Sequence, residues 1–155
     1  MIVPLASFAQ ECKLIKATDP FTKEKTISSG FISMEGASLT IDANKQEIDM
    51  LFTISGADKC FSDGAMVSIF FAGTKSKLTQ RNNGPMNCEG IIHFILRNST
   101  TPQSLLKRFA TQKIEKFVFT GNNKKESIIT LTPEQQQLLV SLSACIMNEA
   151  PTLLQ

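Results

Sequence analysis

The stretch SLTIDANKQEIDMLFTI, residues 38–54, carries the clearest structural pattern in the chain. Apolar and polar side chains alternate from Ser38 to Asp42 and again from Glu47 to Ile54, as they do in a β-strand with one buried face. Asn44-Lys45 lies between the two runs and supplies residues that favour a turn. The stretch therefore predicts a β-hairpin that presents one apolar face to a core.

Short apolar segments continue on both sides of this hairpin. Asp19-Pro20 has turn chemistry, since Asp suits the first turn position and Pro fixes φ at the second. Most segments are separated by such turns and not by helices, which favours antiparallel pairing over a parallel sheet. Further strands are expected at residues 12–18, 25–34, 66–72, 77–81, 90–96, 113–120 and 127–131, with those at 66–72 and 90–96 buried.

Two helices are predicted from matched start signals. Thr101-Pro102 is expected to open a short helix over Gln103–Ala110, with Thr as the N-cap and Pro at the first helical position. Thr132-Pro133-Glu134-Gln135 has the spacing of a capping box and opens a helix that runs to about Asn148. Its buried stripe is expected at Leu138, Leu142, Cys145 and Ile146.

These elements define the expected fold class as α+β, mainly β. We expect an antiparallel curved sheet or small barrel of about eight or nine strands, with one short helix and a long C-terminal helix packed on it. The 155 residues fit one domain, which we place at residues 11–155. No stretch approaches the roughly 20 apolar residues of a membrane-spanning helix.

Residues 1–10, MIVPLASFAQ, pose a separate question. Ser7 and Ala9 are small residues two apart, immediately before Gln10, as at a signal-peptidase site. The apolar run is short and no positive segment precedes it, so the stretch resembles only the back half of a leader. We interpret it as a truncated signal-peptide remnant, which predicts a periplasmic or secreted protein. The alternative is a short edge strand in a cytoplasmic protein.

Four cysteines are spread along the chain. They form no C-x-x-C pair and only one histidine exists, so a zinc site is not expected. In a reducing compartment they would be buried thiols, whereas an exported chain could pair them in any of three ways. We favour Cys12–Cys145, because chain termini often lie close together, with Cys60–Cys88 as a second disulfide.

Composition bears on the class of partner. Eleven Phe with no Trp or Tyr suits a core more than a surface that stacks sugars or bases, so nucleic acid is not an expected partner. The net charge is only +2, but the segment Arg97–Lys125 holds seven basic residues against the single acid Glu115. This segment is either a solvated surface or a docking surface for an anionic partner.

Catalytic signatures are sparse. His93 is the only histidine, and no G-x-S-x-G motif or glycine-rich phosphate loop is present. Glu47 and Asp49 share a strand face that we expect to be wet and merely solvating. We therefore expect no cofactor and no metal, and we identify no residue as catalytic unless His93 serves an enzyme.

Three functional hypotheses remain, and no motif identifies a family. The first is a non-enzymatic binding protein, exported by a bacterium, that holds a small apolar ligand or a protein partner. Its ligand cavity would be lined by side chains such as Phe52, Phe70 and Phe94. The second is an enzyme with a barrel-interior site around His93. The third is docking to an anionic partner through Arg97–Lys125.

Overall fold

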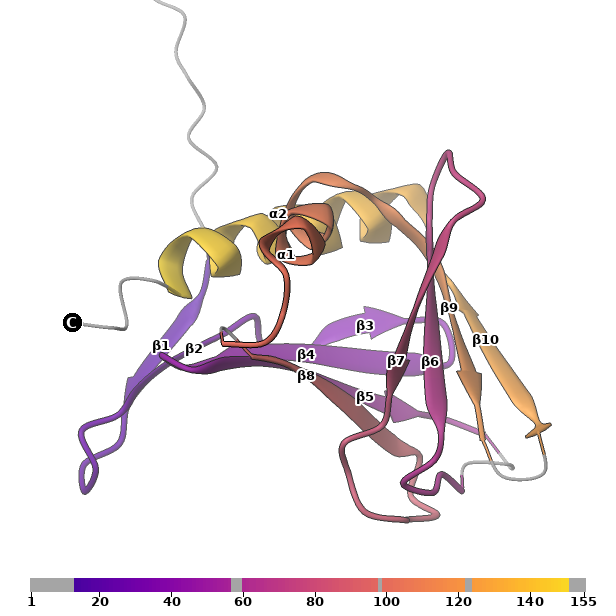
Figure 1. Ribbon diagram of the computed structural model, residues 1–155, viewed down its shortest axis with the longest axis horizontal. Helices are drawn as coiled ribbons and strands as arrows, with labels where there is room; N and C mark the ends of the chain where they lie inside the picture. Colours follow the sequence, from indigo (N-terminus) through magenta and orange to yellow (C-terminus); the bar gives the residue numbers. More distant parts are fainter. Residues whose placement is uncertain (1–12, 57–59, 98, 122–123, 151–155) are drawn as a thin grey trace, which may run out of the picture.

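The computed structural model describes residues 13–56, 60–97, 99–121 and 124–150, so the expected leader remnant lies outside the described residues. The described residues form ten strands in two antiparallel sheets and two helices (Figure 1). In chain order the elements are β1 (Ile15–Thr18), β2 (Lys25–Ser28), β3 (Ile32–Met34), β4 (Ala37–Ala43), β5 (Glu47–Ile54), β6 (Met66–Phe71), β7 (Lys77–Arg81), β8 (Ile91–Arg97), α1 (Gln103–Thr111), β9 (Ile114–Thr120), β10 (Glu126–Thr130) and α2 (Pro133–Glu149). The predicted mainly-β α+β class is confirmed, but the sheets do not close into a barrel.

The first sheet has the strand order β1-β2-β4-β5-β8, with β3 also paired to β4. Its centre is the predicted hairpin β4–β5, in which Leu39 lies opposite Phe52 and Ile41 opposite Met50. The expected single strand at 25–34 is wrong, because the chain breaks into β2 and β3 at Gly30, whose φ is +69°. Glycine is the residue that adopts this left-handed conformation without a steric penalty.

The second sheet has the order β10-β9-β6-β7, so its central pair joins strands that are not consecutive in the chain. The expectation that β6 is buried on both faces is wrong. Val67, Ile69 and Phe71 are fully buried, but Phe70 on the opposite face is partly exposed. A register shift lies between Phe70 and Phe71, which marks a bulge in the pairing with β9.

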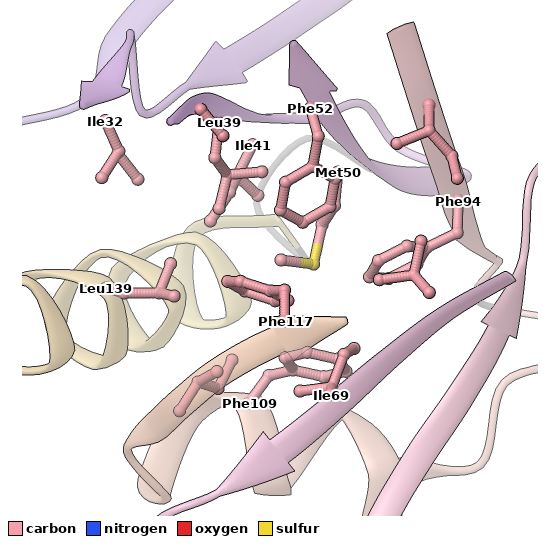
Figure 2. Close-up of a cluster of buried hydrophobic side chains, with 14 of the residues drawn as sticks. Ile32, Leu39, Ile41, Met50, Phe52, Ile69, Phe94, Phe109, Phe117 and Leu139 are labelled. Atoms are coloured by element: carbon pink, nitrogen blue, oxygen red, sulfur yellow. The ribbon is translucent and has the colours of Figure 1, made fainter. Parts of the chain in front are cut away.

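Aromatic rings from both sheets make the core between them (Figure 2). The ring of Phe52 on β5 packs edge-on against Phe117 and Phe119 of β9, with both centroid distances at 4.9 Å. The helices cover this layer: Phe109 of α1 lies 6.4 Å from the Phe94 ring, and Leu139 of α2 is buried in the same cluster. Phe52 therefore ties the two sheets together.

The helix α1 spans the expected residues but starts differently. Its N-cap is Pro102 and not Thr101, and no side chain caps it. Pro102 itself has a ψ of 140°, so it lies outside the helix and takes the N-cap position that was expected for Thr101. Phe109 is its one fully buried residue.

The helix α2 begins with the predicted capping box, which is confirmed. Gln135 N donates to Thr132 Oγ1, and Thr132 N donates to Gln135 Oε1. The expected stripe is partly wrong, because Leu138 is 48% exposed and Leu139 is buried in its place. The buried face is thus turned by one residue at its start, about 100° around the axis. The buried residues of the helix are Leu139, Ser143, Cys145 and Ile146.

Asparagine side chains cover the outer edge of β8. A sheet edge exposes unpaired backbone groups, which other chains can bind. Three asparagines of the segment 82–87 accept hydrogen bonds from alternate amides of β8, in the way that a neighbouring strand would. The donor–acceptor pairs are His93 N with Asn82 Oδ1, Ile95 N with Asn83 Oδ1, and Ile91 N with Asn87 Oδ1.

Neither α1 nor α2 combines the length and the apolar character needed to cross a lipid bilayer.

Candidate functional site

His93 points away from the core, on the outer face of the first sheet. Its strand neighbours Ile92 and Phe94 are fully buried, whereas the imidazole is 20% exposed. The expected location in a barrel interior is therefore wrong: no barrel forms, and strand alternation sends this side chain outward.

Asp49 is the partner of this histidine. Its Oδ1 lies 2.8 Å from His93 Nδ1, and the Asp49 side chain is only 31% exposed. Burial raises the pKa of the Asp49 carboxyl, while the hydrogen bond to His93 opposes that rise. The expectation of a freely solvated Asp49 is thus wrong, because Asp49 is half-buried and tied to the histidine.

The other edge of the imidazole lies against Gly84. A Cβ at Gly84 would approach His93 Cδ2 to 2.9 Å and Nε2 to 3.1 Å, so only glycine fits there without displacing the ring. Among the described residues no hydroxyl or thiol is hydrogen-bonded to this histidine, and no three metal-binding side chains gather. The pair joins the side chains of β5 and β8, and the described residues give it no nucleophile.

The cysteines fall into two groups. Cys60 and Cys88, the pair put forward as the second disulfide, are joined to each other in the structure. Cys145 is also disulfide-bonded. Cys12 lies outside the described residues, so the Cys12–Cys145 pairing stays a prediction.

The three phenylalanines expected to line a ligand cavity do not lie together. Phe52 and Phe94 are fully buried and their ring centroids are 6.1 Å apart. Phe70 belongs to the opposite, outer face of the second sheet. A shared cavity between these three side chains is therefore not formed.

A hollow of about 310 Å³ lies instead where the β1–β2 hairpin meets the end of α2. Its walls include Lys16, Lys25 and Glu149, and Lys16 Nζ lies 3.7 Å from Glu149 Oε2. Three charged side chains form part of its lining and two of them make an ion pair, so it does not resemble an apolar ligand site.

The basic residues of the segment Arg97–Lys125 lie on several different elements. Arg97 lies on the first sheet, with its Nε 3.5 Å from Glu47 Oε2. Arg108 of α1 stacks 4.1 Å above the Phe71 ring and donates to Ser76 Oγ. Lys116 lies on β9, on the outer face of the second sheet. The structure thus distributes the segment over separate elements.

The outer face of the second sheet gathers a different set of residues. Phe70 lies opposite Lys77 of β7 on one side and opposite Lys116 of β9 on the other. Lys116 in turn lies opposite Thr130 of β10. We call the row Lys77–Phe70–Lys116–Thr130 the Phe70 face. It joins residues from four strands, and only Lys116 belongs to the basic segment expected from the sequence.

Both lysines contact the same aromatic ring. Lys116 Nζ lies 4.8 Å from the Phe70 centroid and Lys77 Nζ lies 6.0 Å from it. A cation over a phenyl ring gains about 0.5–1 kcal/mol at an exposed site. Phe70 therefore lies between two lysines, and the ammonium group of each interacts with its ring.

Within the described part of the chain, neither Lys77 nor Lys116 pairs with a carboxylate. Lys113, in the connection before β9, is exposed near the same end of the sheet, since its carbonyl accepts from Ala72 N just after β6. Ser68 and Thr79 add hydroxyls on the neighbouring row, 3.4 Å apart. The Phe70 face is thus positively charged and carries hydroxyl groups that can donate hydrogen bonds.

No protein-family model, no curated protein and no solved structure matches this chain.

Proposed function

We propose that the protein is a non-enzymatic binding protein that docks an anionic partner on the Phe70 face. The observation that carries this proposal is the Phe70 ring with Lys77 and Lys116 on either side of it. A partner that carries carboxylates or phosphates could accept charge-assisted hydrogen bonds from each of the two lysines. The small overall charge of the chain does not oppose this, because binding depends on the local potential.

The chemistry of the rest of the molecule supports binding over catalysis. The Asp49–His93 pair has no nucleophile among the described residues, and Gly84 occupies the free edge of the imidazole. The aromatic side chains pack against one another and not around a shared cavity. An open, rigid sheet face is a surface suited to a macromolecular partner.

Charge reversal tests the proposal. The double variant Lys77→Glu/Lys116→Glu and the matched control Lys23→Glu/Lys25→Glu carry the same net charge, but the control alters only the β1–β2 hairpin. Retention on phosphate-bearing beads is measured over a salt gradient. The wild type and the control should elute together, and the Lys77/Lys116 variant should elute at lower salt.

Equal elution of the two double variants would show that only net charge matters and would exclude the Phe70 face. Retention of the wild type that does not fall as salt is added would exclude electrostatic docking altogether.

We also propose that the protein acts in an oxidising compartment, the periplasm or the cell exterior. The support is the Cys60–Cys88 disulfide together with the absence of a free cysteine among the described residues. Intact mass, measured with and without reductant on protein made with an export leader and on protein made in the cytosol, tests this. Free thiols in the exported product, or equal folding of the fully reduced chain, would contradict it.

A further inference from the structure

The outer edge of β10 is open. Gly121 N donates to Lys125 O, and Leu131 N donates to Glu115 O, so the odd-numbered residues here bond toward β9. In an antiparallel ladder the alternate residues point the other way. Glu126, Ile128 and Thr130 therefore direct their backbone N–H and C=O groups away from the sheet, and β10 has no second neighbouring strand among the described residues.

The edge strands β8, β7 and β1 each carry a feature that discourages pairing. Asparagine side chains cover β8, as described above. The edge strand β7 carries Lys77 and Arg81, and charged side chains of this kind protect edges. The edge strand β1 also exposes an isoleucine, Ile15, but the next residue, Lys16, is charged and pairs with Glu149 of α2. The centre of β10 is instead Ile128, an isoleucine that is 57% exposed.

The sequence of β10 is self-complementary about Ile128. If a second copy pairs antiparallel with Ile128 opposite Ile128, Glu126 lies opposite Thr130 at both ends. The outward-pointing backbone N–H and C=O groups of Glu126, Ile128 and Thr130 would then form hydrogen bonds with the same groups of the second copy. The two isoleucine side chains meet on the outer face beside Val118, which already lies opposite Ile128 within one copy.

Charge also fits this register. Glu126 of the second copy would lie opposite Thr130, in the same row as Lys116, which has no carboxylate partner among the described residues. Like charges would not be opposed at any of the three pairs, since the outward residues are one acid, one isoleucine and one threonine.

We propose that the second sheet pairs with a second copy of this chain through β10, which makes a continuous eight-stranded sheet with a two-fold axis at Ile128. The axis is perpendicular to the sheet, so both Phe70 faces lie on the same side. This inference rests on the β10 edge and stands whether or not the Phe70 face binds an anion.

Light scattering coupled to size exclusion tests the oligomeric state of the full chain. A short edge contact gives a weak dimer, so concentrations from about 1 to 500 µM are used. The mass is expected to rise toward twice the 17.0 kDa of the monomer. Ile128→Lys should weaken the association at least about tenfold, as a charge at the centre of the contact cannot be paired. The matched control is Thr79→Lys, on the outer face of the opposite edge strand β7.

Cross-linking reports the register independently of stability. Opposed residues in a hydrogen-bonded pair have Cα atoms about 5.5 Å apart, so a short bis-maleimide should join two Ile128→Cys chains. Thr79→Cys chains should stay single. A monomer over the whole concentration range overturns the proposal. So does a dimer that Ile128→Lys leaves intact, or one that links through residue 79 and not through 128.

Discussion

His93 Nδ1 and Asp49 Oδ1 lie 2.8 Å apart on adjacent strands, so the single histidine of the chain is held by a half-buried carboxylate. Burial is the largest influence on this carboxyl and raises its pKa above the ordinary 3.8, and the nearby charges of Asp42 and Glu47 add to the rise. The folded protein therefore binds the Asp49 proton more tightly than the unfolded chain does.

The sign of the pH effect follows from this difference. As pH falls through the folded-state pKa of Asp49, protonation relieves the buried charge and adds stability until the unfolded chain is protonated as well. The free energy of unfolding of the wild type, minus that of Asp49→Asn, should therefore be larger at about pH 3 than at about pH 5.5. Urea unfolding of both proteins measures it, and a difference that grows with pH would contradict the raised pKa.

Asn82 is the buried asparagine of the segment that covers β8. It is 4% exposed, donates to Ser62 O, and accepts from the amides of Gly84 and His93. Asn82→Ala leaves buried groups without partners and should lower the free energy of unfolding by about 1–3 kcal/mol. Asn83→Ala is the matched control, because Asn83 is exposed and its one bond to Ile95 N can be replaced by water. An equal loss in both variants would show that burial of Asn82 is unimportant.

Phe52 should dominate the stability of the contact between the sheets. Its ring is fully buried and touches Phe117 and Phe119. Phe52→Ala removes these contacts and leaves a cavity, at a cost of about 3–5 kcal/mol in the free energy of unfolding. Phe21→Ala, at a ring that is 92% exposed in the β1–β2 turn, should change it by less than about 0.5 kcal/mol. Chemical denaturation compares them, and a small effect at Phe52 would mean that the sheets are not joined there.

Substitutions at Gly90 and Gly73 distinguish the cost of a steric clash from the cost of backbone strain. Both have a positive φ, at +79° and +77°. A Cβ at Gly90 would collide with the carbonyl oxygen of Ile54, whereas a Cβ at Gly73 meets nothing within 4 Å. Gly73→Ala should cost about 1 kcal/mol from strain alone, and Gly90→Ala should cost more than about 2 kcal/mol. Thermal unfolding of the two variants measures the difference, and equal losses would place Ile54 farther from Gly90 than described.

The local parts of the fold could be predicted from the sequence. The β4–β5 hairpin could be predicted because apolar side chains recur at every second position in residues 38–54. The capping box of α2 was found because both of its bonds join residues three apart. Such features depend on neighbours along the chain, and so a single sequence contains their signal.

The features that depend on distant pairing could not be predicted. Phe70 and Phe71 read as one apolar run, yet the strand sends them to opposite faces, and the partner Lys116 comes from a strand 46 residues farther along. The Asp49–His93 bond spans 44 residues and exists only because β8 pairs with β5 in this register. The sequence pattern predicted only that Asp49 lies on a polar strand face, and it indicated that this face is fully solvated.

The order of the second sheet has a consequence for how the chain is made. The ribosome synthesises β6 long before β9. The strand that contains Phe71 therefore gains its second neighbouring strand only after residues 114–120 have been made. Phe52 is separated from its partner Phe117 by a longer stretch of chain, so its contact also forms late. The inner surface of the first sheet is therefore uncovered through most of translation, and long-range pairing of this kind is slow. We expect nascent chains arrested before residue 114 to remain protease-sensitive, and the whole molecule to become resistant in a single late step.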